Sequence, residues 1–232
     1  MSGQRVALCS RMLAAYDIGA GSGVITANET CQALIFLWGS GGSGTSNVTS
    51  AGGGGGAGAV FKRVSLLPAD TLTYSIATGA LTSGVGGSGN DGADSTLSGP
   101  GASLRAKGGK GASGNSGGVG GAAIGGDLNR KGGAGGLGDS GGAATSGSAG
   151  EFGGAGGSSS NATHGGGGGA AGFSDIVGAL FQGGIGNTAQ AGTISPPGGY
   201  PGGGSGGADS TSGHQSGAGG DGRLLVYLIS LA

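Results

Sequence analysis

Few residues of this sequence could do chemistry, and the first candidates lie in the pentapeptide Gly138-Asp-Ser-Gly-Gly142. A serine in this setting is the nucleophile of one class of Ser-His-Asp proteases, where it needs a histidine base and an orienting aspartate. In proteases with this motif both partners precede the serine, whereas His164 and His214, the two histidines here, both follow Ser140. The flanks are glycine-rich, so such a pentapeptide arises easily by chance. The pattern therefore does not predict a protease.

A second candidate is Gly39-Ser-Gly-Gly-Ser-Gly44, which follows an apolar run and has the spacing of a dinucleotide-binding loop. That loop must open a helix, and an acidic residue about 20 positions later must bind the ribose. Lys62 and Arg63 stand near that position instead. Two isolated histidines and two cysteines, Cys9 and Cys31, make no metal-ligand cluster. We therefore expect a protein that is not an enzyme and has no catalytic residue, metal or cofactor.

Glycine dominates the composition, with 68 of 232 residues, most of them between positions 39 and 222, against roughly 7% in ordinary proteins. A chain of this kind is a flexible linker unless its backbone N–H and C=O groups find partners. Collagen is excluded, because there are 5 prolines and no unbroken Gly-X-Y repeat. Sustained alternation of glycine with alanine or serine, as in silk, is also missing.

Glycine recurs instead at every third position, at 108, 111, 114, 117 and 120, and again from 132 to 156 with one interruption at Ala144. Three residues per turn is the period of a polyproline-II-type helix, which has no internal hydrogen bonds. Its backbone groups can then bond to neighbouring helices if the inward positions carry no side chain. The spacing predicts a bundle of polyglycine-II helices.

Charge and hydropathy exclude two classes of partner. The net charge is −1, and basic residues are scattered rather than interleaved with aromatic residues in a stripe, so we expect no nucleic-acid binding. No run approaches the roughly 20 apolar residues of a membrane span, and the N-terminus lacks the pattern of a signal peptide. We expect synthesis in a cytoplasm and no membrane insertion. Cys9 and Cys31 are expected to be buried thiols, with a later disulfide left open.

The N-terminal residues 1–38 predict a small β segment that docks the protein. Short strands are expected at residues 6–9 and 24–26, with a turn over residues 17–23. Residues 31–38 form a continuous apolar run of strand length, which indicates a strand buried on both faces.

Residues 39–222 are expected to form the glycine array, with a hairpin inserted at residues 59–78. There Thr71, Thr73 and Ser75 alternate with Leu72, Tyr74 and Ile76, which puts one apolar face inward. A short helix is expected at residues 173–182, because five apolar residues fall on one helical face. They are Phe173, Ile176, Val177, Leu180 and Phe181. Residues 223–232 predict a closing strand that pairs with the strand ending at Trp38.

The order of these parts resembles a known family. An apolar strand enters a glycine run at Leu37-Trp38-Gly39-Ser-Gly-Gly, residues 52–67 lead from a GGGGGAGA segment into a strand, and Gly220-Asp-Gly-Arg-Leu-Leu-Val-Tyr closes the chain. This arrangement resembles the glycine-rich domain of bacteriophage tail-fibre and other virion proteins, and is similar to the glycine-rich region of anaplastic lymphoma kinase receptors. The resemblance implies a mainly β fold with little α-helix: a small, jelly-roll-like β-sandwich from which a polyglycine-II bundle emerges.

The resemblance also implies a function. We expect a non-enzymatic structural protein of a phage virion, a tail-fibre or tip adhesin that contacts the host surface. Two alternatives stay open: a capsid decoration or head-fibre protein, and an ice-binding protein. Expected partners are other virion proteins, further copies of the chain (a trimer is one arrangement) and a host receptor. The candidate receptor contacts are Phe152, His164, Tyr200 and His214, and the apolar face of the helix at residues 173–182 is a candidate anchor into a partner subunit.

Overall fold

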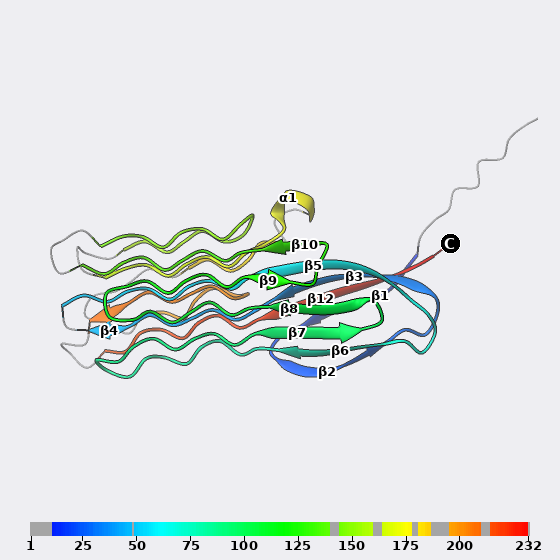
Figure 1. The fold of residues 1–232 in the computed structure, drawn as a ribbon, viewed down its shortest axis with the longest axis horizontal. Helices are drawn as coiled ribbons and strands as arrows, with labels where there is room; N and C mark the ends of the chain where they lie inside the picture. Colours follow the sequence, from blue (N-terminus) through cyan, green and yellow to red (C-terminus); the bar gives the residue numbers. More distant parts are fainter. Residues whose placement is uncertain are drawn as a thin grey trace, which may run out of the picture.

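The computed structural model consists of two antiparallel sheets and a set of extended glycine-rich segments that continue from one end of them (Figure 1). It describes residues 11–47, 49–139, 144–159, 164–177, 181–186, 195–209 and 214–231. The predicted mainly β fold with almost no helix is confirmed, since helix in these residues is nearly confined to the four-residue α1 (Ser174–Val177).

Each large sheet has five antiparallel strands. Sheet A has the order β1 (Met12–Ile18), β12 (Arg223–Ser230), β3 (Cys31–Trp38), β5 (Ala59–Leu66) and β10 (Leu128–Arg130). Sheet B has the order β2 (Gly21–Thr26), β6 (Thr71–Ile76), β7 (Ser95–Gly99), β8 (Ala102–Ala106) and β9 (Ala123–Ile124). A third, parallel pair joins β4 (Ser46–Asn47) to β11 (Ala208–Asp209) far from the sandwich (Figure 1).

The strand β3 is central to sheet A and confirms two predictions. It pairs with β12 from Trp38↔Arg223 to Cys31↔Ser230, so the closing strand lies beside the strand that enters the glycine stretch. Its residues are buried on both faces, because Ile35 and Leu37 face the core between the sheets while Phe36 and Trp38 face a second cluster outside sheet A. Cys31 is fully buried, as expected, and burial raises the pKa of its thiol; Cys9 lies outside the described residues.

The segment predicted as a hairpin contains the expected strands, β5 and β6, and the expected alternation. Leu72 and Ile76 are buried, while Thr71 and Thr73 are exposed. The prediction that these two strands pair as a hairpin is wrong, because β5 belongs to sheet A and β6 to sheet B. The turn after β5, where the Asp70 carboxylate accepts the N–H of Leu67 at 2.8 Å, carries the chain from one sheet to the other.

The N-terminal prediction needs a similar correction. Residues 6–9 lie outside the described residues, and the first strand, β1, begins at Met12. The predicted turn over residues 17–23 is too long, because β1 continues to Ile18 and β2 resumes at Gly21. The expected strand at residues 24–26 is the second half of β2.

Four strands of the two large sheets, β7 to β10, lie inside the stretch predicted as glycine array. In β7 and β8 exposed polar residues flank Leu97 and Leu104, which are buried in the core between the sheets. The turn between them contains Gly101, whose φ of 68° is a conformation that favours glycine. Two-residue alternation was therefore present in the sequence, just before the first run of glycines with a three-residue period.

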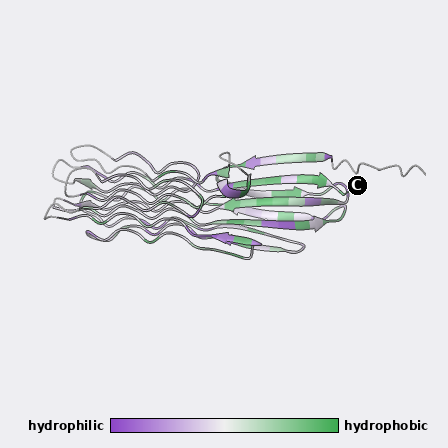
Figure 2. Ribbon diagram, turned by 90° about the horizontal axis from the view of Figure 1, so that it is seen from above, coloured by the Kyte–Doolittle hydropathy of each residue, from purple (hydrophilic) through white to green (hydrophobic). Residues whose placement is uncertain are grey.

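The glycine-rich segments run between the sandwich and the far end of the molecule and lie against one another (Figure 1). Hydropathy separates the two regions, since hydrophobic residues concentrate on the strands of the sandwich (Figure 2). We call the glycine-rich region the array; its segments include residues 39–46, 51–58, 107–112, 117–122, 131–138, 164–172 and 202–208. We call its end beside the sandwich the junction and its opposite end, with β4 and β11, the distal end.

Hydrogen bonds between array segments recur with a period of three residues. From Gly52 to Gly58 each successive N–H donates to a different neighbouring segment, and the same neighbour returns after three residues, with N···O distances of 2.8–3.2 Å. Gly52, Gly55 and Gly58 donate to Gly114, Lys110 and Lys107; Gly53 and Gly56 donate to Gly136 and Gly133; Gly54 and Ala57 donate to Ser205 and Gly202. Each segment is thus bonded on several sides, unlike a strand, which bonds within one plane.

The array packs too closely for side chains at its inner positions. A Cβ added to Gly54 would lie 2.3 Å from the Gly42 carbonyl oxygen, and one added to Gly56 would lie 2.1 Å from that of Gly169. Alanine and small polar residues occupy other inward positions, and hydroxyls there are hydrogen-bonded; the Ser205 hydroxyl accepts the N–H of Gly44 at 3.0 Å and donates to the Gly217 carbonyl at 2.6 Å. The glycines are therefore required by backbone-to-backbone contact.

Candidate functional site

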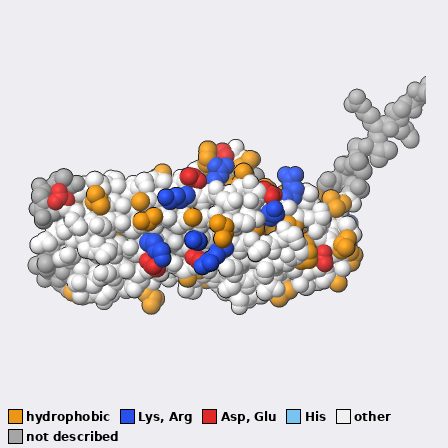
Figure 3. Space-filling view, in the orientation of Figure 1, with side chains coloured by type: hydrophobic (Ala, Val, Ile, Leu, Met, Phe, Trp, Pro, Cys, Tyr) orange, Lys and Arg blue, Asp and Glu red, His pale blue; other side chains and the backbone are white. Residues whose placement is uncertain are grey.

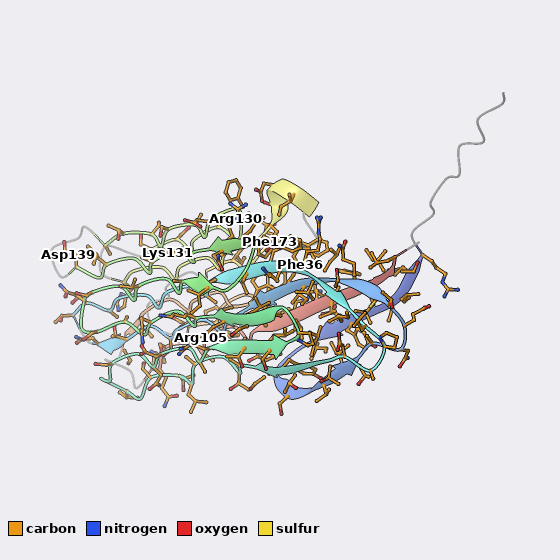
Figure 4. All side chains as sticks on the ribbon, turned by 45° about the vertical axis from the view of Figure 1, so that its right-hand side comes forward. Phe36, Arg105, Arg130, Lys131, Asp139 and Phe173 are labelled. Carbon is orange, nitrogen blue, oxygen red and sulfur yellow. The ribbon has the colours of Figure 1, made fainter. Side chains whose placement is uncertain are left out.

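An aromatic cluster lies at the junction, on the outer face of sheet A. Phe173 is fully buried and its ring centroid lies 5.5 Å from that of Phe36, 5.7 Å from Trp38 and 6.3 Å from Phe61. The Trp38 indole donates to the Ala171 carbonyl at 2.9 Å. Figure 4 shows Phe36 and Phe173 together, at the point where the array leaves the sandwich. This cluster fixes the array to sheet A.

The predicted anchor residues differ in their exposure to solvent. Phe173 is internal, so as it stands it is not available to a partner subunit. Phe181 is half-buried against Phe36 and Tyr227, whereas Ile176 is 50% exposed. The described helix α1 covers Ser174–Val177, within the predicted range 173–182. Residues 178–180, which include Leu180, and the side chain of Val177 lie outside the described residues.

Phe152, a predicted receptor contact, lies near the junction rather than at the distal end. Its carbonyl accepts the Ser174 hydroxyl at 2.9 Å, and its ring, in a residue 51% exposed, lies 4.0 Å beneath the Arg130 guanidinium. Arg130 also donates to Asp175 at 2.8 Å. A cation over an aromatic face stabilises by about 0.5–1 kcal/mol when exposed, so this contact helps to hold α1.

Tyr200, a second predicted contact, also lies at the junction. It is 52% exposed, and the Arg223 guanidinium lies 5.6 Å from its ring centroid. Arg223 donates through Nε and Nη2 to both Asp17 oxygens, at 2.9 and 2.8 Å. These hydrogen bonds from Arg223 hold the pKa of Asp17 below its usual value. Burial raises the pKa of the Tyr200 phenol.

The two predicted histidine contacts lie at the distal end. His164 is 3% exposed and pairs with Ala51 in an isolated bridge, so its side chain is not presented to a receptor in this conformation. His214 is half-buried, and its carbonyl accepts the Ser46 hydroxyl at 2.5 Å. The structure therefore does not bring Phe152, His164, Tyr200 and His214 into one site, because two lie at each end of the array.

Lys or Arg side chains lie beside Asp or Glu side chains at several places on one face of the molecule (Figure 3). Asp91 and Asp94, three residues apart, each accept a backbone N–H from the next segment, at Gly111 and Gly108, both at 2.9 Å. Asp91 also accepts from Lys110 at 2.6 Å, and Asp94 from Arg105. Sequence reasoning missed this ladder, although the three-residue spacing of the aspartates follows the period of the glycines. The two aspartates supply hydrogen-bond acceptors for backbone N–H groups of the array.

Ser140 of the protease-like motif lies outside the described residues. The described residues contain no cluster of three or more histidine, cysteine, aspartate or glutamate side chains. No helix in the same residues is long and apolar enough to span a membrane.

The paired sheets and the cross-bonded array define a glycine-rich, mainly β domain. A family model described as a glycine-rich domain matches residues 19–228, so the chain belongs to the glycine-rich domain family. A search of curated proteins finds no match.

Proposed function

We propose that the array is a polyglycine-II bundle and that the protein is a non-enzymatic structural component of a phage virion, a tail-fibre or tip adhesin. The observation that carries the first part is the three-residue period of the hydrogen bonds donated by residues 51–58. A helix with three residues per turn presents its N–H groups in three directions, which is the pattern found there. Such a bundle is stiff and has little side-chain surface.

The arrangement of the two ends supports a projecting role. The described residues begin and end at the sandwich, where Ser230 N–H donates to the Arg11 carbonyl at 2.8 Å. The array extends from the other end of the sandwich (Figure 1). We propose that the sandwich docks to other virion proteins, in one or several copies, while the distal end contacts the host. His214 is then a better candidate contact than Phe152 or Tyr200, which lie at the junction.

Particle composition and adsorption test this proposal. Mass spectrometry of particles purified from cells that produce the protein is expected to find it at a few copies per particle. The purified chain is expected to compete with adsorption of those particles to the host, and His214→Ala to weaken that competition. Phe152→Ala, at the junction, serves as the matched control and is expected to compete like the wild type.

Other outcomes separate the alternatives. Hundreds of copies per particle without competition would identify a capsid decoration or head-fibre protein. Absence from purified particles would overturn the virion role, and thermal hysteresis of the purified chain would then favour ice binding.

A further inference from the structure

A hollow of about 190 Å³ lies on the outer face of sheet A, where β1 and β12 are neighbours. Its lining includes Leu225, the aromatic residues Phe181 and Tyr227, and the Asp17–Arg223 pair. Because side chains alternate between the faces of a strand, Arg223 and Tyr227 lie on the same face of β12 as Leu225, one on each side of it. This space is large enough for several water molecules. That is the scale of one small ring rather than of a chain segment.

The Asp17–Arg223 pair offers donors and acceptors in one plane. A guanidinium has five N–H donors, and the two hydrogen bonds to Asp17 use two of them. Asp17 is 61% exposed on its side chain and each oxygen accepts one of these bonds, which leaves lone pairs for a ligand. Arg223 is held in place, since its side chain is 20% exposed and Tyr200 lies over the guanidinium.

Another part of the lining is aromatic. The rings of Phe181 and Tyr227 lie 6.1 Å apart, inclined at 49°, and both residues are half-buried. They offer an apolar surface beside the polar pair. A ligand with one C–H face and adjacent hydroxyl groups would satisfy both parts of the lining, because hydroxyls donate and accept.

The opposite charges of Asp17 and Arg223 favour a neutral ligand over an ion. An isolated anion would meet the Asp17 carboxylate, and an isolated cation would meet Arg223, so neither gains an unopposed partner. We propose that this hollow binds a single neutral pyranose unit of a saccharide, with vicinal hydroxyls on Asp17 and Arg223 and a C–H face on Phe181 and Tyr227. The proposal concerns the isolated chain and does not depend on a virion role.

Titration of the full chain, followed by amide chemical shifts, tests the site. The probes are the methyl glycosides of glucose, galactose and mannose, with N-acetylneuraminic acid as an anionic comparison and N-acetyl-tyrosine amide as a peptide comparison. At least one neutral glycoside is expected to give saturable shifts at Leu225 and Tyr227. A dissociation constant on the order of 1 mM is expected, because the hollow is small and open.

Two variants and two matched controls decide the assignment. Asp17→Asn and Phe181→Leu are each expected to weaken binding about tenfold, as expected when a charged hydrogen-bond partner or a stacking ring is lost. Asp127→Asn alters another aspartate of sheet A's surface, paired with Lys62 at 2.8 Å, and Phe152→Leu alters another exposed ring; neither is expected to change binding. Thermal melting of each variant checks that it is folded.

Three results would overturn the proposal. One is the lack of saturable shifts with every neutral glycoside, and another is tighter binding of the acidic sugar or of the tyrosine amide. The third is binding that Asp17→Asn and Phe181→Leu leave unchanged. If a variant unfolds, the residues whose amide chemical shifts change in the wild type still test the proposal. Changes confined to the array or to sheet B would place the ligand outside the hollow and overturn it.

Discussion

Replacing Gly54 by alanine is expected to destabilise the protein by about 3 kcal/mol or more, at the upper end of what overpacking usually costs. The new Cβ would lie 2.3 Å from the Gly42 carbonyl oxygen, a rigid backbone atom that cannot rotate away. Gly54 also donates to Ser205 and accepts from Gly168, both at 2.8 Å, so any shift disturbs two further segments. A domain of this size loses roughly 2–4 °C of melting temperature per kcal/mol, and thermal unfolding followed by circular dichroism measures the change.

Gly84→Ala is the matched control for this prediction. Gly84 is exposed and an added Cβ would meet no atom within 4 Å. Its melting temperature is expected to stay within about 2 °C of the wild type, as for most surface substitutions. Equal melting of Gly54→Ala and Gly84→Ala would contradict the close packing of the array.

Replacing Phe173 by alanine is expected to lower the free energy of unfolding by about 3–5 kcal/mol, the usual cost of truncating a buried phenylalanine. Phe173 is fully buried against Phe36 and Trp38. Its loss would leave a void under the contact that joins the array to sheet A. Denaturant unfolding of the purified chain measures the effect.

Ile176→Ala provides the comparison within α1. Ile176 is 50% exposed, and its truncation is expected to cost less than about 1 kcal/mol. If Phe173→Ala left the free energy of unfolding of the isolated chain unchanged, the aromatic cluster would not be what holds the array to sheet A. Phe173 would then again be a candidate anchor into a partner subunit.

The pairing of β3 with β12 could be predicted from the sequence because both are long apolar runs that bracket the glycine stretch. The sandwich form was expected from the family resemblance and not from these runs. The burial of both faces of β3 also followed from its continuous apolar character, with Phe36 and Trp38 on the side opposite Ile35. Hydrophobic pattern and strand length were sufficient there, since each reports burial directly.

The partners of β5 and β6 could not be predicted in the same way. The alternation in β6 shows that Leu72 faces inward. The same alternation would be found whether β5 paired with β6 in one sheet or lay in the opposite sheet, so it does not identify the partner strand. The strands β7 and β8 were missed because abundant glycine on either side obscured a short alternation around Leu97 and Leu104.

The candidate contacts were chosen by residue type, and type alone does not report position. Aromatic residues in glycine-rich sequence suggest exposed loops, yet Phe152 and Tyr200 are held at the junction by Arg130 and Arg223. The hollow beside Asp17 depends on residues more than 200 positions apart in the sequence, which only the pairing of β1 with β12 brings together.

Amide hydrogen exchange in residues 51–58 and 164–172 tests the central claim most directly, because it reports each backbone N–H in solution. We expect protection in the array comparable to that of β3 and β12, including at Gly53, Gly54 and Gly55, which donate in three different directions. Exchange of these amides at the rate of an unstructured chain, with β3 and β12 still protected, would contradict a cross-bonded array.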